Sequence, residues 1–350
     1  MLSAPDFNDA RKDYMNFQKT GYDLFSILIA PVEDYFISER VLISPDNLLS
    51  YLPFETLPVK NSSNSNLSYK EIEFMMEEYD ISYTYSATFM AENLRNKKSN
   101  GSKVIAFAPD YSDPVNIQEL YQKRQQQGNI LYDLPYARME AEYVSKKLGG
   151  KLLINESARE SEFKKDAPDF DIIHLAMHTV LDDDNPMRST LIFSPDSTGT
   201  EDRFLRTYEI YNIPLKARMV VLSSCNTGTG KLFSGEGILS LARGFIYSGC
   251  ESVVMSMWEI EDRAGTDIVK LYYDYLKKGY SKSMSLRKAR IDFLRKADQL
   301  RAHPYFWSTL VVYGDNSPII RPVWPRFLIA ALIILIAVVL IYHLRKRRYS

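Results

Sequence analysis

A series of short apolar runs, separated by segments of helical periodicity, constrains the fold more than any other feature of this sequence. Val104–Phe107, Asp171–Leu175, Met219–Ser223 and Ser252–Met257 are nearly continuous in apolar residues. Such runs are typical of parallel strands, because helices cover both faces of a parallel sheet. The amphipathic segment Leu134–Leu148 is typical of a covering helix. The pattern therefore predicts an α/β fold with a mostly parallel sheet.

Weaker patterns predict the flanking elements. We expect a helix at Tyr22–Phe36, a strand within Arg40–Asp46 and a helix at Asn47–Pro58. A further helix is expected at Tyr83–Leu94. Lys151–Ile154 is a predicted strand of the central sheet, and the last strand is expected near Thr309–Tyr313. The predicted soluble part is thus one layered domain.

The C-terminal region predicts a membrane anchor. Phe327–Tyr342 is 16 residues long without a charge, and a cluster of cations follows it at Arg345–Arg348. At about 1.5 Å per residue, a helix over 327–344 reaches about 27 Å, slightly less than a typical bilayer core. Trp324 and Tyr342 stand where interfacial aromatic residues belong. We expect one transmembrane helix at 327–344, in contact with the lipid bilayer, and a basic tail at 345–350.

The orientation of this anchor stays open. The basic tail favours a cytoplasmic C-terminus, with the main domain on the other side. Export would need an N-terminal signal, yet Met1–Thr20 is polar and has no apolar stretch. Two alternatives remain: a C-terminal part of a longer exported protein, or a tail-anchored protein whose domain lies in the cytoplasm.

Charge and cysteine content exclude several classes of protein. With 43 Lys+Arg against 44 Asp+Glu, the net charge is -1, so no global field draws the chain to nucleic acid. Two cysteines make no disulfide framework, and no C-x-x-C pair suggests structural zinc. Cys225–Leu232 approaches a phosphate-binding loop but lacks its first glycine and its Ser or Thr. We expect no cofactor and no metal.

The candidate catalytic residues follow two of the predicted strands. His178 comes shortly after the strand Asp171–Leu175, and Cys225 follows Met219–Ser223, 47 residues later. Caspases have a similar spacing, with the histidine about 50 residues before the cysteine. A cysteine nucleophile needs an imidazole to form its thiolate and to protonate the leaving amine. The backbone N–H groups of Cys225 and Thr179 are candidate oxyanion donors.

Each of these residues also has a purely structural interpretation. A lone cysteine at a strand end is usually a small buried hydrophobe, and a lone histidine there is usually packed. We expect Cys250 and His174 to be of this structural kind. His174 and His178 have metal-like spacing, but along a strand they lie about 13 Å apart, too far to share one zinc ion.

Ordered motifs along the chain resemble the CHAT domain, a caspase-like module often found beside tetratricopeptide repeats. The resemblance runs over Tyr22–Asp315. It suggests a lead-in at 1–21 that could end an upstream region, the domain at 22–316 and a linker at 317–326. The motifs that carry it are LIAPVEDYF, RVLISPDNLLSYLPFETLP, LPYARMEAEYVSKKLGG, IIHLAMHTVL, VVLSSCNTGTGKLFSGEG and HPYFWSTLVVYGD.

This resemblance implies a caspase-like αβα sandwich and, in active members, cysteine endopeptidase chemistry. Cys225 matches the nucleophile and His178 the general base and acid. Asp262 matches an acidic position near the substrate cleft, and Glu259 and Asp182 are further cleft candidates. Solvation on a loop is the alternative interpretation of these acids, and we favour it for Asp182. The implied partners are a protein or peptide substrate and a tetratricopeptide-type regulatory region or protein.

Two departures keep a second function open. Thr179 stands where many relatives have glycine, so a branched side chain could narrow the cleft. Ser223 stands where metacaspase-like relatives have an acid, so a pocket for a basic residue is not supported. The first hypothesis is a membrane-anchored cysteine endopeptidase that cleaves a protein partner under regulation. The second is a catalytically inactive scaffold that holds partners at a membrane.

Overall fold

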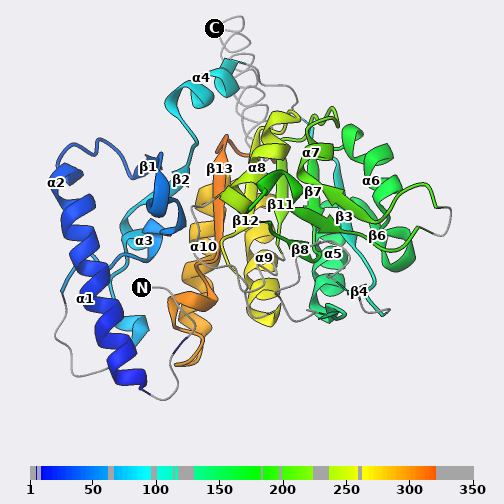
Figure 1. Ribbon diagram of the computed structural model, residues 1–350. Coiled ribbons are helices and arrows are strands. Elements are labelled where there is room, and N and C mark those ends of the chain that lie inside the picture. The colour runs from blue at the N-terminus through cyan, green and yellow to red at the C-terminus, as the bar shows by residue number, and fades with distance from the viewer. Residues whose placement is uncertain are drawn as a thin grey trace, which may run out of the picture.

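A computed structural model gives the arrangement of the chain (Figure 1). It describes residues 5, 9–61, 67–95, 101–112, 115–116, 130–182, 184–196, 199–223, 236–258 and 262–320. Among these residues, no helix has the length and apolar character needed to cross a membrane. The predicted transmembrane helix at 327–344 and the basic tail lie outside the described residues.

An eight-stranded sheet forms the centre of the molecule, in the order β1-β2-β13-β12-β11-β7-β3-β6. Every neighbouring pair is parallel except β12 and β13, which are antiparallel. The predicted mostly parallel sheet is therefore confirmed. The strands are β1 Arg40–Ile43, β2 Asp80–Tyr83, β3 Val104–Ala108, β6 Lys151–Ile154, β7 Ile172–Leu175, β11 Met219–Leu222, β12 Ser252–Ser256 and β13 Leu310–Gly314.

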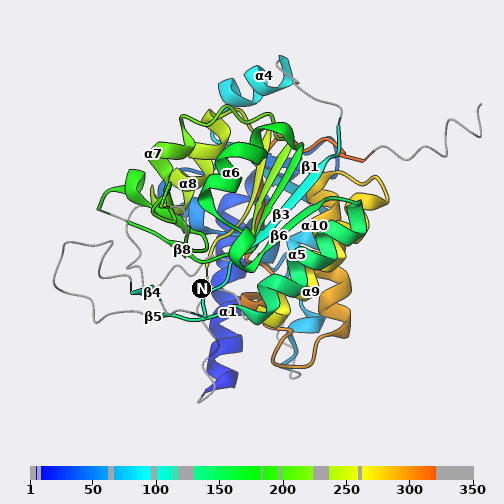
Figure 2. The same ribbon diagram turned by 90° about the vertical axis from the view of Figure 1, so that its right-hand side faces the viewer.

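Helices cover both faces of the sheet, which confirms the predicted α/β sandwich. Figure 2 shows α5, α9 and α10 on one side and α6, α7 and α8 on the other. Successive residues of a strand point to opposite faces. Val220 and Leu222 accordingly join the core beneath α6–α8, and Met219 and Val221 join the core beneath α5, α9 and α10. The helices are α5 Pro135–Leu148, α6 Glu160–Asp166, α7 Thr207–Ile210, α8 Glu236–Tyr247, α9 Asp262–Lys277 and α10 Lys282–Lys296.

Two small sheets and several short turns complete the described part. A three-stranded antiparallel sheet has the order β10-β9-β8, and β4 pairs with β5. These strands are β4 Val115–Asn116, β5 Ile130–Leu131, β8 Thr179–Val180, β9 Thr190–Ile192 and β10 Phe204–Arg206. The 3-10 turns are Asn47–Tyr51, Phe54–Thr56, Tyr69–Glu71, Asn155–Ser157, Ala167–Asp169, Pro186–Arg188 and Pro304–Phe306. The prediction of a helix over Asn47–Pro58 was therefore wrong: the segment forms two 3-10 turns, because Pro53 interrupts it.

The N-terminal helix is longer than the sequence predicted. Helix α1 spans Ala10–Leu28, with Asp9 as its N-cap, and the short α2 spans Ala30–Glu33. The side chains of Tyr14, Phe17 and Phe25 are buried. Their spacing places them on one helical face, so packing holds together a segment whose many charges suggested a polar lead-in.

The prediction for Tyr83–Leu94 was wrong at its start. Tyr83 is the last residue of strand β2, and helix α4 begins later, at Ala87–Arg95. β2 is buried along its whole length between β1 and β13. A short helix, α3 Met75–Glu78, precedes it. Pairing with the neighbouring strands thus makes this segment a strand, although its sequence shows no clear hydrophobic periodicity.

A buried ion pair ties the motif YLPFETLP to the far end of the sequence. The Glu55 Oε1 atom lies 2.9 Å from Nη1 of Arg290, and both side chains are almost completely buried. The Tyr83 hydroxyl donates to the other Glu55 oxygen at 2.6 Å, and Nη2 of Arg290 donates to the Leu310 carbonyl. The turn at Glu55, strand β2, helix α10 and strand β13 are therefore joined at one point.

Candidate functional site

The candidate site lies beyond the C-terminal ends of β3, β7 and β11. These three strands are parallel neighbours, so their C-terminal ends meet at one edge of the sheet. The Ala176 N–H donates to the Phe107 carbonyl, and the Ser223 N–H donates to the Leu175 carbonyl. The backbone ladder thus continues past the last strand residues and holds these ends together.

His178 is held on its imidazole by a backbone carbonyl. Its Nε2 atom lies 2.7 Å from the carbonyl oxygen of Tyr132, just after β5. A carbonyl oxygen can only accept, so Nε2 carries the proton and Nδ1 keeps its lone pair. The histidine is therefore the tautomer with a basic Nδ1 atom.

Burial favours the neutral form of this imidazole. The side chain is 5% exposed, and this burial lowers the pKa of His178 below its ordinary value. The hydrogen bond to Tyr132 and the nearby Asp133 carboxylate oppose the shift but do not reverse it. His178 can therefore accept a proton at neutral pH, as a general base must.

The backbone of His178 is fixed as well. Its N–H donates to the Tyr111 hydroxyl at 3.0 Å, and its carbonyl accepts from the Ile192 N–H at 3.1 Å. The Tyr111 ring meets the imidazole nearly edge-on, with 4.6 Å between the ring centroids. The sequence did not single out Tyr111; its place directly after the strand Val104–Ala108 and Pro109-Asp110 was the available signal.

Thr179 presents its N–H away from the small sheet. Thr179 pairs with Leu191 in the β8–β9 ladder, and the bond from Ile192 N–H to the His178 carbonyl makes this a non-hydrogen-bonded pair. The N–H of Thr179 therefore points to the side of β8 opposite β9. The residue is completely buried. This orientation suits an oxyanion donor.

The other predicted site residues are placed only in part. Cys225 and Glu259 lie outside the described residues, and Asp262 is the first residue of α9, with its side chain outside them. Asp182 is half-buried, and its Oδ1 atom accepts the N–H of Asn185 at 2.8 Å. Its carboxylate thus shapes its own loop.

The two residues predicted to be structural are buried. Cys250 is buried, with 2% of its surface exposed. His174 is completely buried, with Nε2 2.9 Å from a Glu140 carboxylate oxygen and Nδ1 3.1 Å from the Tyr273 hydroxyl. Both predictions are confirmed.

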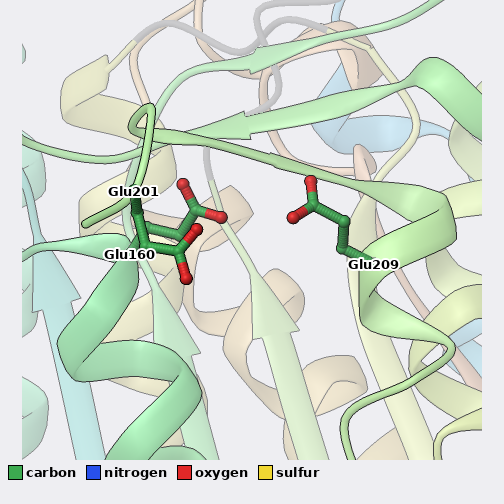
Figure 3. Close-up of side chains that lie close together, drawn as sticks. All are labelled: Glu160, Glu201 and Glu209. Atoms are coloured by element: carbon green, nitrogen blue, oxygen red, sulfur yellow. The ribbon is translucent and has the colours of Figure 1, made fainter. Parts of the chain in front are cut away.

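Three glutamates outside this site gather around a lysine. Glu160, Glu201 and Glu209 come from α6, a loop and α7 (Figure 3), and in the described part of the chain they alone lie close enough to share a metal ion. The Lys164 ammonium lies 2.8 Å, 2.9 Å and 3.0 Å from their respective carboxylates. The lysine thus supplies the positive charge that this cluster needs, and it ties α6 to the small sheet.

The layered sheet, with His178 beyond the C-terminal ends of its parallel strands, defines an α/β protein whose candidate site lies at one edge of the sheet. The chain belongs to the CHAT domain family, whose profile matches residues 18–315. It is 23% identical over 220 residues to mouse tetratricopeptide repeat protein 28 and 22% identical to its human counterpart. These alignments cover 54% of this chain, and the chain spans 9% of the length of either relative.

Several solved structures are similar to this chain at low sequence identity. The separase–securin complex of Saccharomyces cerevisiae has a TM-score of 0.45 and 13% identity, over 70% of this chain and 14% of that one. Gingipain R, an Arg-specific cysteine proteinase, has a TM-score of 0.46 and 10% identity, over 92% of this chain and 71% of that one. The Porphyromonas gingivalis complex of RgpB pro- and mature domains has a TM-score of 0.48 and 9% identity, over 90% of this chain and 78% of that one.

Proposed function

We propose that this CHAT domain protein is a cysteine endopeptidase in which Cys225 is the nucleophile and His178 the general base and acid. The observation that carries the proposal is the state of His178: neutral, held through Nε2 and left with a basic Nδ1 atom. A histidine that only fills the core needs no such arrangement at the ends of parallel strands.

The strand register supports the pairing of the two residues. Leu222 of β11 is the register partner of Leu175 of β7. Cys225 and His178 each follow their leucine by three residues. Strands β7 and β11 therefore end at the same level, which favours the pairing of Cys225 with His178.

The proposed chemistry is acyl transfer through a thioester. As the Cys225 sulfur attacks the scissile carbonyl, its proton passes to Nδ1 of His178, and the Tyr132 carbonyl stabilises the imidazolium through the Nε2 proton. The backbone N–H groups of Cys225 and Thr179 bind the oxyanion. The imidazolium then protonates the amine as the C–N bond breaks. Water attacks the thioester with His178 again as base, the C–S bond breaks, and His178 returns the proton to the Cys225 sulfur as the acid product leaves.

Three further parts of the proposal rest on the sequence. Asp262 and Glu259 border the substrate cleft. Residues 327–344 anchor the protein in a membrane as one helix. A tetratricopeptide-type region or partner regulates the enzyme, in keeping with the names of the mouse and human relatives.

Covalent capture tests the proposal. The full chain is treated with a library of peptidyl acyloxymethyl ketones, and the modified cysteine is located by mass spectrometry. We expect an adduct on Cys225 that is absent in Cys225→Ala and at least tenfold slower in His178→Ala, while Cys250→Ala behaves as wild type.

A scaffold function is the second candidate, and the burial of both His178 and Thr179 favours it, because substrate must reach the imidazole. A chain that remains folded but forms no His178-dependent adduct with any probe contradicts the peptidase and favours the scaffold.

A further inference from the structure

The Tyr111 hydroxyl closes a ring of hydrogen bonds around the backbone of His178. It accepts the His178 N–H at 3.0 Å and donates to the Ile192 carbonyl at 2.6 Å. The Ile192 N–H in turn donates to the His178 carbonyl at 3.1 Å. Three segments far apart in the sequence, at the ends of β3, β7 and β9, are thus joined through one hydroxyl.

The donor and acceptor roles in this ring are fixed. Tyr111 is 1% exposed, and burial raises the pKa of its hydroxyl, so the group stays protonated. Its proton serves the Ile192 carbonyl, which can only accept, and its lone pair serves the His178 N–H, which can only donate. No group in the ring can exchange roles, so the arrangement has a single form.

The aromatic ring of Tyr111 restricts the imidazole itself. The two ring planes meet at 63°, with 4.6 Å between their centroids. The imidazole is therefore held at Nε2 by the Tyr132 carbonyl and along its side by Tyr111. With these contacts in place, rotation of the His178 side chain would break a hydrogen bond or a ring contact.

The same ring of bonds aims the neighbouring peptide. In a trans peptide the C=O and N–H groups point in opposite directions. The Ile192 N–H holds the His178 carbonyl, so the Thr179 N–H of the same peptide is directed to the opposite side. The proposed base and the proposed oxyanion donor are thus oriented by one structure.

We propose that Tyr111 is a positioning residue for the dyad: its hydroxyl sets the backbone of His178 and Thr179, and its ring sets the imidazole. This inference rests on the proposed function for its catalytic meaning. A tyrosine that merely fills the core would contribute to stability without affecting the state of His178.

The test compares Tyr111→Phe with Tyr272→Phe in the full chain. Phenylalanine keeps the ring and removes the hydroxyl. Tyr272 is an equally buried tyrosine whose hydroxyl contacts the Met219 sulfur, so its variant is a matched control. Two readouts are measured: the pH profile of Cys225 alkylation by iodoacetamide, and the pKa and tautomer of His178 by NMR of chains labelled with ¹⁵N-histidine.

We expect Tyr111→Phe to lower the His178-dependent part of the alkylation rate at least tenfold, with Tyr272→Phe unchanged. The NMR spectrum should show a loss of the single Nε2-protonated tautomer. The NMR readout does not require an active cysteine, so it tests the positioning role even where the peptidase proposal fails. A His178 signal in Tyr111→Phe identical to that of wild type would overturn the inference.

Discussion

Neutralising Glu55 should destabilise the protein strongly, because it would leave the Arg290 guanidinium buried without its counter-charge. The two side chains are each 2% exposed, and their atoms approach to 2.9 Å. The Glu55→Gln substitution keeps the size and shape of the side chain. Its effect is therefore mainly electrostatic, and the hydrogen bond from the Tyr83 hydroxyl can still form.

Breaking a buried ion pair by removing one partner costs about 3–5 kcal/mol. That is a large part of the ~5–15 kcal/mol by which most domains are stable. Replacing both partners, as in Glu55→Gln with Arg290→Met, removes the unpaired charge. The double variant should therefore be much more stable than the sum of the single effects predicts, by about 2 kcal/mol or more.

Urea unfolding of the full chain, followed by circular dichroism, measures these differences. With an m-value of about 3 kcal/mol/M, a loss of 4 kcal/mol lowers the unfolding midpoint by about 1.3 M. Asp23→Asn is the control, since the Lys19–Asp23 pair is exposed and should contribute less than about 1 kcal/mol. Single effects that add without coupling, or a Glu55→Gln loss below about 1 kcal/mol, would refute the reasoning.

Three further predictions concern stability. Burial raises the pKa of Glu160 to about 7. The free energy of unfolding therefore falls as pH rises from 4.5 to 7, because the unfolded chain releases this proton more readily. Glu160→Gln should gain stability relative to wild type over that range. Burial lowers the pKa of His303 to about 4, so stability present above pH 6.5 is lost as pH falls toward 4, and His303→Gln should flatten this loss. Thermal unfolding across pH checks both, and an unchanged profile contradicts either. Phe163→Ala should cost about 3–5 kcal/mol in urea unfolding, because its ring is buried against Phe107 and Phe193; a loss below 1 kcal/mol contradicts that packing.

The centre of the sheet could be predicted because its strands are apolar on both faces. The runs at Val104, Met219 and Ser252 were predicted within a residue of their observed bounds. Burial on both faces leaves such strands almost no polar positions, so the local sequence carries the information. The antiparallel direction of β13 depends on how the chain returns after α10, which no local pattern shows.

The errors lie around α1, β1 and β2, toward one edge of the sheet. β2 was missed because Asp80–Tyr83 mixes polar and apolar residues, and only its neighbours β1 and β13 make it a strand. The start of α1 was missed because its buried face, including Tyr14 and Phe17, stands among many charged residues. In both cases the deciding contacts are with residues far away in the sequence.

The site was predictable in its reactive residues and not in their support. His178 could be found because it follows an apolar strand. The groups that set its state, the Tyr132 carbonyl and the Tyr111 hydroxyl, are 46 and 67 residues away from it. One is a backbone atom that any residue could supply, so no side-chain pattern points to it.

The most direct measurement of the central claim is the rate of Cys225 alkylation by iodoacetamide between pH 5 and 9. It is made on the full chain in the Cys250→Ala background, with His178 present and with His178→Ala. The account predicts that at pH 6 to 7 Cys225 reacts at least tenfold faster when His178 is present. A profile with its midpoint near the ordinary thiol value of ~8.5, the same in both proteins, would contradict a Cys225–His178 dyad.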